Sequence, residues 1–213
     1  MIRILIADDH TLVREGLKQL LAAAGDLQVV AEAVDGDAAL ARARDTELDL
    51  ALLDMSMPGL AGIELIKRLE AEKPRLRIVV LSMHAEQQYA ARAFKAGASA
   101  YLTKDSAAAQ LVAAIRKVAS GGVYVSAAAA EQLAVGSQAV DGALPHTRLS
   151  DREFEVFRMI VDGRSLTEIG DALHLSVKTV STHKTRLLQK MNMGSTAELV
   201  RYAIEHQLVD ARG

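Results

Sequence analysis

The chain has 213 residues, of which half are hydrophobic and 3% are aromatic, so it can form one or two domains with aliphatic cores. It has no Cys, which excludes disulfides and thiolate metal sites, and its 25 Lys and Arg nearly balance 27 Asp and Glu. Asp8 and Asp9 interrupt the apolar N-terminus, and no apolar run reaches the roughly 18 residues of a membrane helix, so we expect a cytoplasmic protein with no signal peptide and no membrane contact.

Residues 2–120 alternate short apolar runs with stretches in which apolar residues recur at helical spacing. The runs predict strands at residues 2–7, 29–33, 50–53, 78–81 and 100–102. The stretches after them predict helices near residues 11–24, 36–45, 62–72, 86–96 and 106–120. Five such repeats predict an α/β domain whose five-stranded, parallel, doubly wound sheet is covered by helices on both faces.

Polar residues follow four of the five predicted strands. In chain order they are Asp8 and Asp9, Asp54, Ser82, and Thr103 with Lys104. Any one of them could simply terminate a strand, but the carboxyl ends of parallel strands share the edge of the sheet where ligands bind. We therefore expect three carboxylates, a hydroxyl and an ammonium group to converge there.

Three carboxylates in one pocket repel each other, and a divalent cation would relieve that repulsion. Oxygen ligands that leave room for water suit Mg²⁺. A metal-bound Asp beside Lys104 can act as a nucleophile toward a phosphoryl group and form an aspartyl phosphate. Lys104 and the cation would neutralise charge on the transferring oxygens, and Ser82 would hydrogen-bond one of them.

With the turn at residues 55–59, this pattern resembles the receiver domain of two-component response regulators over about residues 1–120. The resemblance implies a flavodoxin-like fold, Mg²⁺ as cofactor and a sensor histidine kinase as partner. It implies that Asp54 is the phosphoacceptor and that Asp9, Asp54 and the Ser56 backbone carbonyl are the Mg²⁺ ligands, with Asp8 behind them. It also implies that Ser82 and Lys104 bind the phosphoryl group and that Tyr101 is the aromatic residue that switches with Ser82. Many receivers have Pro after the lysine, where this chain has Asp105.

Residues 121–147 are predicted to form a linker, because Gly, Ser and Pro interrupt any regular pattern there. Residues 148–213 predict four helices. Ser150, Ser165 and Ser195 each stand three residues before a Glu, as in a capping box, and Ser176 caps the remaining helix. A tight turn near residues 174–175 separates the second and third helices, as in a helix-turn-helix. The caps alone leave a generic docking bundle open.

The third of these helices favours nucleic-acid binding. Residues 176–190 contain four cations and no acid: Lys178, Lys184, Arg186 and Lys190. The helical spacing places Val177, Val180, Leu187, Leu188 and Met191 inward and Lys178, Thr182, Thr185 and Gln189 outward. A face of small hydroxyls and cations can enter a major groove. Lys184 falls on the inward half, so we expect its stem to pack and its ammonium group to reach a phosphate.

The segments 149–157, 168–176 and 178–191 resemble the LuxR-type helix-turn-helix, and the whole chain resembles a NarL/FixJ-type response regulator. The resemblance implies base contacts from Ser181, Thr182 and Thr185. The expected DNA-binding residues are Lys178, Thr179, Ser181, Thr182, His183, Lys184, Thr185 and Arg186. The last helix matches the dimer surface of the output domain, with Ala197, Val200, Arg201 and Ile204.

The sequence thus predicts a transcription regulator with a receiver at 1–120, a linker at 121–147 and a DNA-binding domain at 148–213. Phosphorylation of Asp54 by the kinase is expected to control homodimerisation and sequence-specific binding to double-stranded DNA, with RNA polymerase as a further candidate partner. We do not expect an enzyme in the usual sense. One alternative is a Mg²⁺-dependent phosphohydrolase, which usually has an Asp where this chain has Ser56. The other is a protein-binding adaptor, against which the acid-free third helix argues.

Overall fold

The computed structural model describes residues 1–57, 59–60, 62–82, 87–104, 106, 108–125, 144–206 and 208. Residue contacts divide the chain into two compact units, Met1–Ala134 and Val135–Gly213. The division falls inside the predicted linker, of which residues 126–143 lie outside the described part of the chain. The predicted bounds of the receiver, the linker and the DNA-binding domain therefore stay a prediction, and each unit is described by itself.

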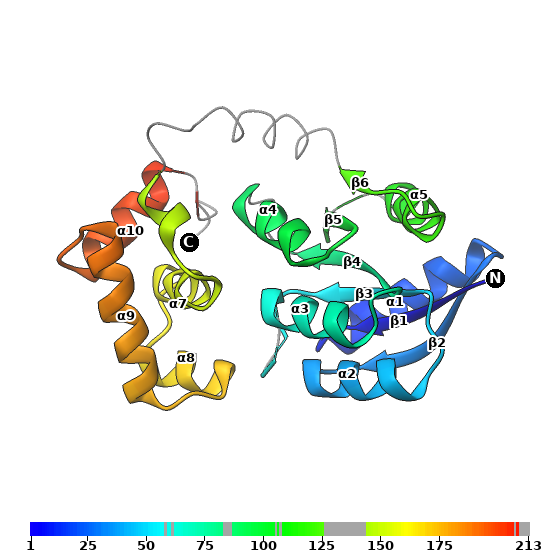
Figure 1. The fold of residues 1–213 in the computed structure, drawn as a ribbon, viewed down its shortest axis with the longest axis horizontal. Coiled ribbons are helices and arrows are strands. Elements are labelled where there is room, and N and C mark those ends of the chain that lie inside the picture. The colour runs from blue at the N-terminus through cyan, green and yellow to red at the C-terminus, as the bar shows by residue number, and fades with distance from the viewer. Residues whose placement is uncertain are drawn as a thin grey trace. The chain divides into compact units, whose positions relative to one another are not determined.

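The N-terminal unit is a parallel sheet that alternates with helices along the chain (Figure 1). Its strands are β1 (Ile2–Ala7), β2 (Leu27–Ala33), β3 (Leu50–Asp54), β4 (Arg77–Ser82), β5 (Ala100–Thr103) and β6 (Tyr124–Val125). Its helices are α1 (Thr11–Ala23), α2 (Gly36–Asp45), α3 (Gly62–Glu72), α4 (Gln87–Ala96) and α5 (Ala108–Ala119). The strand order β2-β1-β3-β4-β5-β6 reverses direction at β1 and β3, the type of point at which ligands bind in doubly wound sheets.

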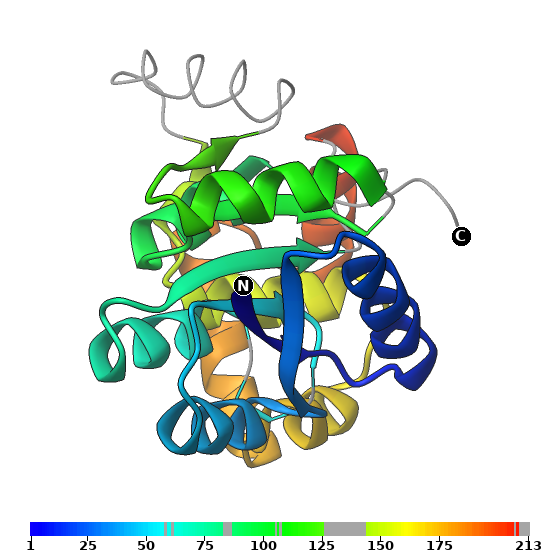
Figure 2. The same ribbon diagram turned by 90° about the vertical axis from the view of Figure 1, so that its right-hand side faces the viewer.

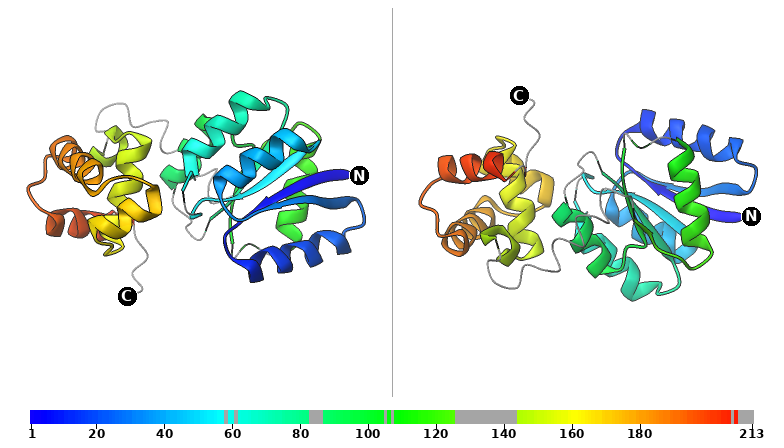
Figure 3. Two further views of the ribbon diagram at one scale, coloured as in Figure 1. Left: turned by 90° about the horizontal axis from the view of Figure 1, so that it is seen from below. Right: turned by 90° about the horizontal axis from the view of Figure 1, so that it is seen from above.

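Helices cover both faces of this sheet (Figures 2 and 3), and an aliphatic core lies between the sheet and the helices on each face. Side chains of α1 and α5, such as Leu21 and Ile115, pack on one face. Side chains of α2, α3 and α4, such as Leu40, Ile66 and Ala93, pack on the other. Because β1, β3 and β4 are buried on both faces, their sequences are almost continuously apolar, and this confirms the predicted doubly wound sheet.

The prediction of five strands was wrong by one, because residues 124–125 form a sixth strand inside the predicted linker. It pairs with β5 through Ala100↔Tyr124 and Tyr101↔Val125, and the Tyr124 N–H donates to the Ser99 carbonyl at 2.9 Å. Two residues after a Gly-Gly pair are too short for a periodic pattern. Only the free edge of β5 makes them a strand.

The C-terminal unit is helical, with a short 3-10 helix η1 (Pro145–Arg148) before α7 (Asp151–Val161), α8 (Leu166–Leu173), α9 (Val177–Met191) and α10 (Thr196–Glu205). Its core includes Phe154, Phe157, Val180 and Leu187. All four predicted caps are in place, since each Ser side chain accepts a hydrogen bond from the backbone three residues later.

The third predicted capping box, at Ser195, is incomplete. Glu198 reaches the N–H of Gly194 at 2.8 Å and the hydroxyl of Ser195 at 3.3 Å, instead of the Ser195 N–H that the motif requires. Between α8 and α9 the chain turns tightly through His174, which adopts a left-handed φ of 51°. The α8–turn–α9 geometry is that of the predicted helix-turn-helix.

Candidate functional site

Strands β1, β3 and β5 bring three predicted site residues into direct contact at the carboxyl edge of the sheet. Lys104 Nζ lies 2.7 Å from Asp8 Oδ2 and 2.9 Å from Asp54 Oδ2. The side chains of Asp8 and Asp54 are 2% and 0% exposed, and that of Lys104 is 10% exposed. Asp54 is the last residue of β3, and Lys104 follows β5, so the parallel register places both residues at the same edge of the sheet.

The charges of this cluster are strongly coupled. Burial raises the pKa of the Asp54 carboxyl group above its ordinary value, although Lys104 acts in the opposite direction. Burial alone would lower the pKa of the Lys104 ammonium group, but hydrogen bonds to Asp8 and Asp54 raise it above the ordinary value. Lys104 therefore remains a cation, and it partly neutralises two buried carboxylates.

The same edge contains a group of candidate metal ligands. Asp8, Asp9, His10 and Asp54 each offer an atom within 4.8 Å of the others. Asp54 Oδ2 is paired with Lys104 Nζ at 2.9 Å, and no other described residue donates a hydrogen bond to it. A buried carboxylate oxygen with a free lone pair and two further carboxylates beside it fit a hard divalent cation such as Mg²⁺.

His10 was not predicted to belong to this group. Its Nδ1 lies 2.8 Å from Asp9 Oδ1 and 3.3 Å from Asp8 Oδ1. The only sequence signal is its position directly after the two Asp residues, and that signal says nothing about where the ring turns. Ser56 also lies beside the pocket, and its N–H donates to Asp54 Oδ1 at 3.2 Å.

Ser82 and Tyr101 lie on neighbouring strands behind the pocket. Both are buried, with 2% and 4% of their surfaces exposed. Burial raises the pKa of Tyr101 to about 12, and a hydrogen bond with Ser82 acts in the opposite direction. The structure thus places the hydroxyls of the two predicted switch residues together. Asp105 lies outside the described residues.

Helix α9 presents most of the predicted nucleic-acid contacts to solvent. The exposed members are Lys178, Thr179, Ser181, Thr182, Thr185 and Arg186, whereas His183 and Lys184 are half-buried. The Thr182 hydroxyl donates to the Lys178 carbonyl at 2.9 Å, and the Thr185 hydroxyl donates to the Ser181 carbonyl at 3.0 Å. Both hydroxyl protons are therefore used within the helix, and the oxygens of these exposed side chains can still accept hydrogen bonds.

Two sequence expectations about α9 were wrong. Val177 was placed inward, but it is 46% exposed at the first position of the helix. Lys190 was counted in the basic patch, but its Nζ lies 2.6 Å from Oε2 of the buried Glu153 in α7. That ion pair spans 37 residues of chain, so helical spacing within α9 could not show it.

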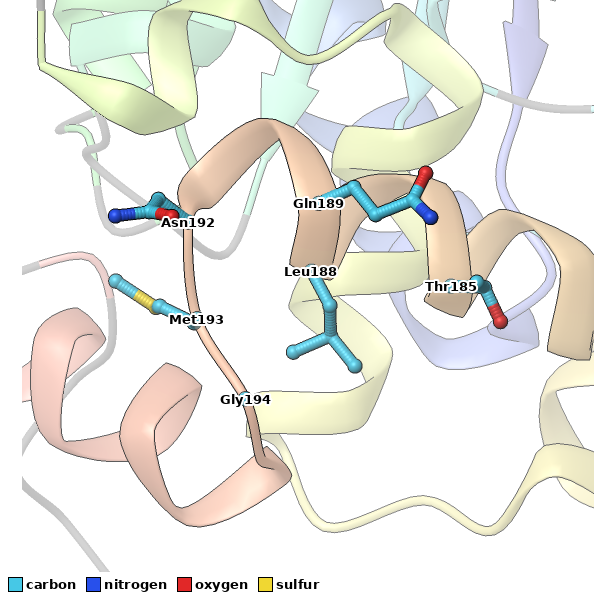
Figure 4. A pocket seen from close by; sticks show the side chains of 6 residues that line it. All are labelled: Thr185, Leu188, Gln189, Asn192, Met193 and Gly194. Carbon is cyan, nitrogen blue, oxygen red and sulfur yellow. The ribbon is translucent and has the colours of Figure 1, made fainter.

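A pocket of about 420 Å³ lies at the C-terminal end of α9 (Figure 4). Thr185, Leu188, Gln189, Asn192, Met193 and Gly194 line it. On α10, Ala197, Arg201 and Ile204 of the predicted dimer surface are exposed and Val200 is half-buried. None of the described helices combines the length and apolar character that a membrane crossing requires.

Comparison with known proteins places both units in families. Residues 4–116 match the family model described as the response regulator receiver domain. Residues 147–203 match the model described as bacterial regulatory proteins of the luxR family.

Relatives and solved structures cover nearly the whole chain. The response regulator GacA of Pseudomonas viridiflava is 39% identical over 212 residues, which is 99% of each chain. A structure of the Salmonella typhimurium RcsB response regulator has a TM-score of 0.77 at 27% identity, over 96% of this chain and 97% of that one. RcsB of Salmonella enterica serovar Typhimurium bound to promoter P1flhDC, in the presence of the phosphomimetic BeF3-, has a TM-score of 0.72 at 27% identity, over 94% and 97%.

The receiver match, the luxR-family match and a relative that is similar over the full length agree with the geometry of both units. The chain therefore belongs to the NarL/FixJ-type response regulators, with an N-terminal receiver domain and a C-terminal LuxR-type DNA-binding domain.

Proposed function

We propose that a sensor histidine kinase phosphorylates Asp54, and that this phosphorylation controls dimerisation and binding to specific promoter DNA. The observation that carries the proposal is the buried Asp54 carboxylate at the sheet edge, where Oδ2 pairs with Lys104 at 2.9 Å and candidate metal ligands from Asp8 and Asp9 lie beside it. A cation next to a carboxylate and two further carboxylates that can hold a metal ion are what phosphoryl transfer to Asp54 requires.

In the reaction, an Asp54 carboxylate oxygen attacks phosphorus, and the bond from phosphorus to the kinase imidazole nitrogen breaks. The nitrogen keeps the electron pair, and the product is an acyl phosphate on Asp54. Asp9, Asp54 and the Ser56 carbonyl would hold Mg²⁺, with Asp8 behind them, and the ion supplies charge neutralisation for the transferring oxygens. Lys104 is within reach of the same oxygens and gains an anionic partner as the phosphoryl group arrives.

The aspartyl phosphate would then be read by Ser82 and Tyr101. A phosphoryl oxygen is a stronger acceptor than a neutral hydroxyl, so Ser82 turns from Tyr101 toward it. Tyr101 loses that hydrogen bond and repacks with the surface around α4 and β5. Tyr101 is already buried in this structure, so the proposed change starts from an inward arrangement of its ring.

At the output domain, α9 is proposed to enter the major groove. Lys178 and Arg186 would bind phosphates, and the acceptor oxygens of Thr182 and Thr185 would read donor groups on base edges. The RcsB complex with promoter DNA, which contains a phosphomimetic, supports this assignment by similarity. A dimer through α10, with Arg201 and Ile204 at its surface, would place two α9 helices about one DNA turn apart. RNA polymerase would be a further partner at such promoters.

The phosphoryl assignment is tested by labelling. The full chain is incubated with acetyl phosphate and Mg²⁺, and intact mass spectrometry should show one phosphate that is acid-stable and base-labile. Asp54→Asn should abolish it, and Asp9→Ala should reduce it by weakening the metal site. Labelling of Asp54→Asn at the wild-type level would refute the assignment. We expect no turnover of generic phosphate esters in the same experiment.

The DNA assignment is tested by capturing genomic fragments with the protein, sequencing them, and measuring affinity for the recovered sites. Affinity should fall steeply with salt, because phosphate contacts release counterions. Lys178→Ala should weaken all sequences alike, Thr182→Ala should act mainly on the recovered sites, and the exposed Lys117→Ala in α5 should do neither. Salt-independent binding would exclude α9 as the interface.

A further inference from the structure

The loop between β1 and α1 sets the direction of two carboxylates of the phosphoryl pocket. It contains Asp8, Asp9 and His10, and short hydrogen bonds fix its backbone. The Asp8 N–H donates to the Ala33 carbonyl at 3.2 Å, and the His10 N–H donates to Asp8 Oδ1 at 2.8 Å. These two contacts order the backbone at the start of the loop. They do not provide a hydrogen-bond donor for the backbone carbonyl of Asp8.

Arg14, in the second turn of α1, satisfies that carbonyl. Its Nη1 donates to the Asp8 backbone oxygen at 2.8 Å, and its Nη2 lies 3.4 Å from Thr11 Oγ1. Its Nε lies 3.4 Å from Oε2 of Glu32 in β2, an ion pair without an aligned hydrogen bond, and only 11% of the Arg14 side chain is exposed. One guanidinium group thus joins the acidic loop to α1 and to the neighbouring strand.

Glu32 is itself bound by a lysine of α1. Lys18 Nζ lies 2.8 Å from Glu32 Oε1 and 2.6 Å from Glu15 Oε1. The charge of Arg14 is therefore balanced by Glu32, and the position of Glu32 is maintained by α1. A planar fork with three separate nitrogen contacts needs Arg; the single ammonium group of Lys could keep only part of it.

We propose that Arg14 is a positioning residue for the divalent cation, which fixes the Asp8–Asp9 loop so that its carboxylates face the ion together with Asp54. This inference rests on the proposed Mg²⁺ site. Arg14 itself touches none of the expected ligand atoms, because its contact is with the Asp8 backbone. Outer contacts of this kind typically contribute about 10-fold to 100-fold to metal affinity.

The sign of the effect separates positioning from simple charge. If Arg14 acted only as a nearby positive charge, its removal would strengthen the binding of a cation. If it positions the loop, its removal weakens binding. We therefore expect Arg14→Ala to raise the Mg²⁺ dissociation constant about tenfold, and Arg14→Lys to restore part of the loss.

The experiment is calorimetric titration of the full chain with MgCl₂, repeated by electron paramagnetic resonance with Mn²⁺, whose spectrum reports the ligand environment. Arg44→Ala is the matched control, because Arg44 forms an ion pair with Glu72 at 2.6 Å on the surface of α2 and α3, away from the carboxylates. It should leave the constant unchanged. If Arg14→Ala does not fold, Lys18→Met keeps the bond from Arg14 to Asp8 but releases Glu32. It also removes a positive charge, so simple charge predicts tighter Mg²⁺ binding, whereas positioning predicts binding that is severalfold weaker.

The outcomes are distinct. An Arg14→Ala protein that binds Mg²⁺ as tightly as the wild type, or more tightly, overturns the positioning role and leaves the metal site intact. A wild-type protein that binds no Mg²⁺ overturns both the metal site and this inference. The positioning role is supported if Arg14→Ala binds Mg²⁺ more weakly, Arg14→Lys recovers part of that loss, and Arg44→Ala binds Mg²⁺ as tightly as the wild type.

Discussion

Replacement of Lys104 by Met tests the electrostatic account of the pocket. Methionine keeps most of the length of the side chain and removes only the ammonium group. The carboxylates of Asp8 and Asp54, 2% and 0% exposed, then face each other without the cation that lies 2.7 and 2.9 Å from them. In the absence of Mg²⁺, the basic group that remains beside these carboxylates among the described residues is His10, whose Nδ1 lies 3.3 Å from Asp8 Oδ1.

Removing one partner of a buried ion pair typically costs about 3 to 5 kcal/mol. We expect the lower end, a loss of about 3 kcal/mol in the free energy of unfolding near pH 8, because the pocket opens to solvent at Asp9, whose side chain is 33% exposed. The exposed ion pairs of Lys18 are screened by water, so Lys18→Met should have a much smaller effect.

The loss should depend on pH in a defined direction. Burial already raises the pKa of Asp54, and without Lys104 the main opposing interaction is lost, which leaves the hydrogen bond from the Ser56 N–H. A carboxyl group whose folded pKa exceeds its unfolded value costs stability as the pH rises through the folded pKa. The deficit of Lys104→Met should therefore be smaller near pH 5 than near pH 8, and Mg²⁺ should reduce it at pH 8.

The assay is urea denaturation of the full chain in EDTA, followed by circular dichroism at several pH values. The transition of the C-terminal unit should not change and serves as the internal reference. A Lys104→Met protein that is as stable as the wild type at pH 8 would mean that the two carboxylates are not both charged in the native pocket. The account of Asp54 as a poised nucleophile would then fail.

Two further predictions concern stability elsewhere. The pKa of Glu153 lies below its ordinary value, because Lys190 and the hydrogen bonds from Ser150 outweigh the effect of burial. The stability that the charged carboxylate contributes is therefore lost as the pH falls through that lowered pKa. Thermal melts between about pH 5 and pH 3 should show a smaller loss of melting temperature in Glu153→Gln than in the wild type. A Cβ on Gly36 would lie 1.6 Å from the Leu60 carbonyl oxygen, so Gly36→Ala should lower the free energy of unfolding by about 3 kcal/mol. Gly16 lies in α1 with open space around it, so Gly16→Ala should raise the free energy of unfolding by about 0.5 to 1 kcal/mol. Equal melting temperatures for the two Gly variants would contradict the second prediction.

Much of the fold follows from local patterns. The runs at 50–53 and 78–81 predicted β3 and β4 because a strand buried on both faces has to be apolar throughout. Ser150 and Ser165 predicted the starts of α7 and α8 because a capping box lies within four residues of chain. The convergence of Asp8, Asp54 and Lys104 could also be predicted, since parallel strands bring their carboxyl ends to one edge.

Only the tertiary structure decided which of those groups touch and which are neutralised. No spacing rule predicts three of the observed contacts. They are the contact of His10 with Asp9, the hydrogen bond from Arg14 to the Asp8 carbonyl and the ion pair of Lys190 with Glu153. The sixth strand exists because β5 has a free edge. Periodicity and capping act within a few residues and are visible in a sequence, whereas the distance between two side chains depends on how whole elements pack.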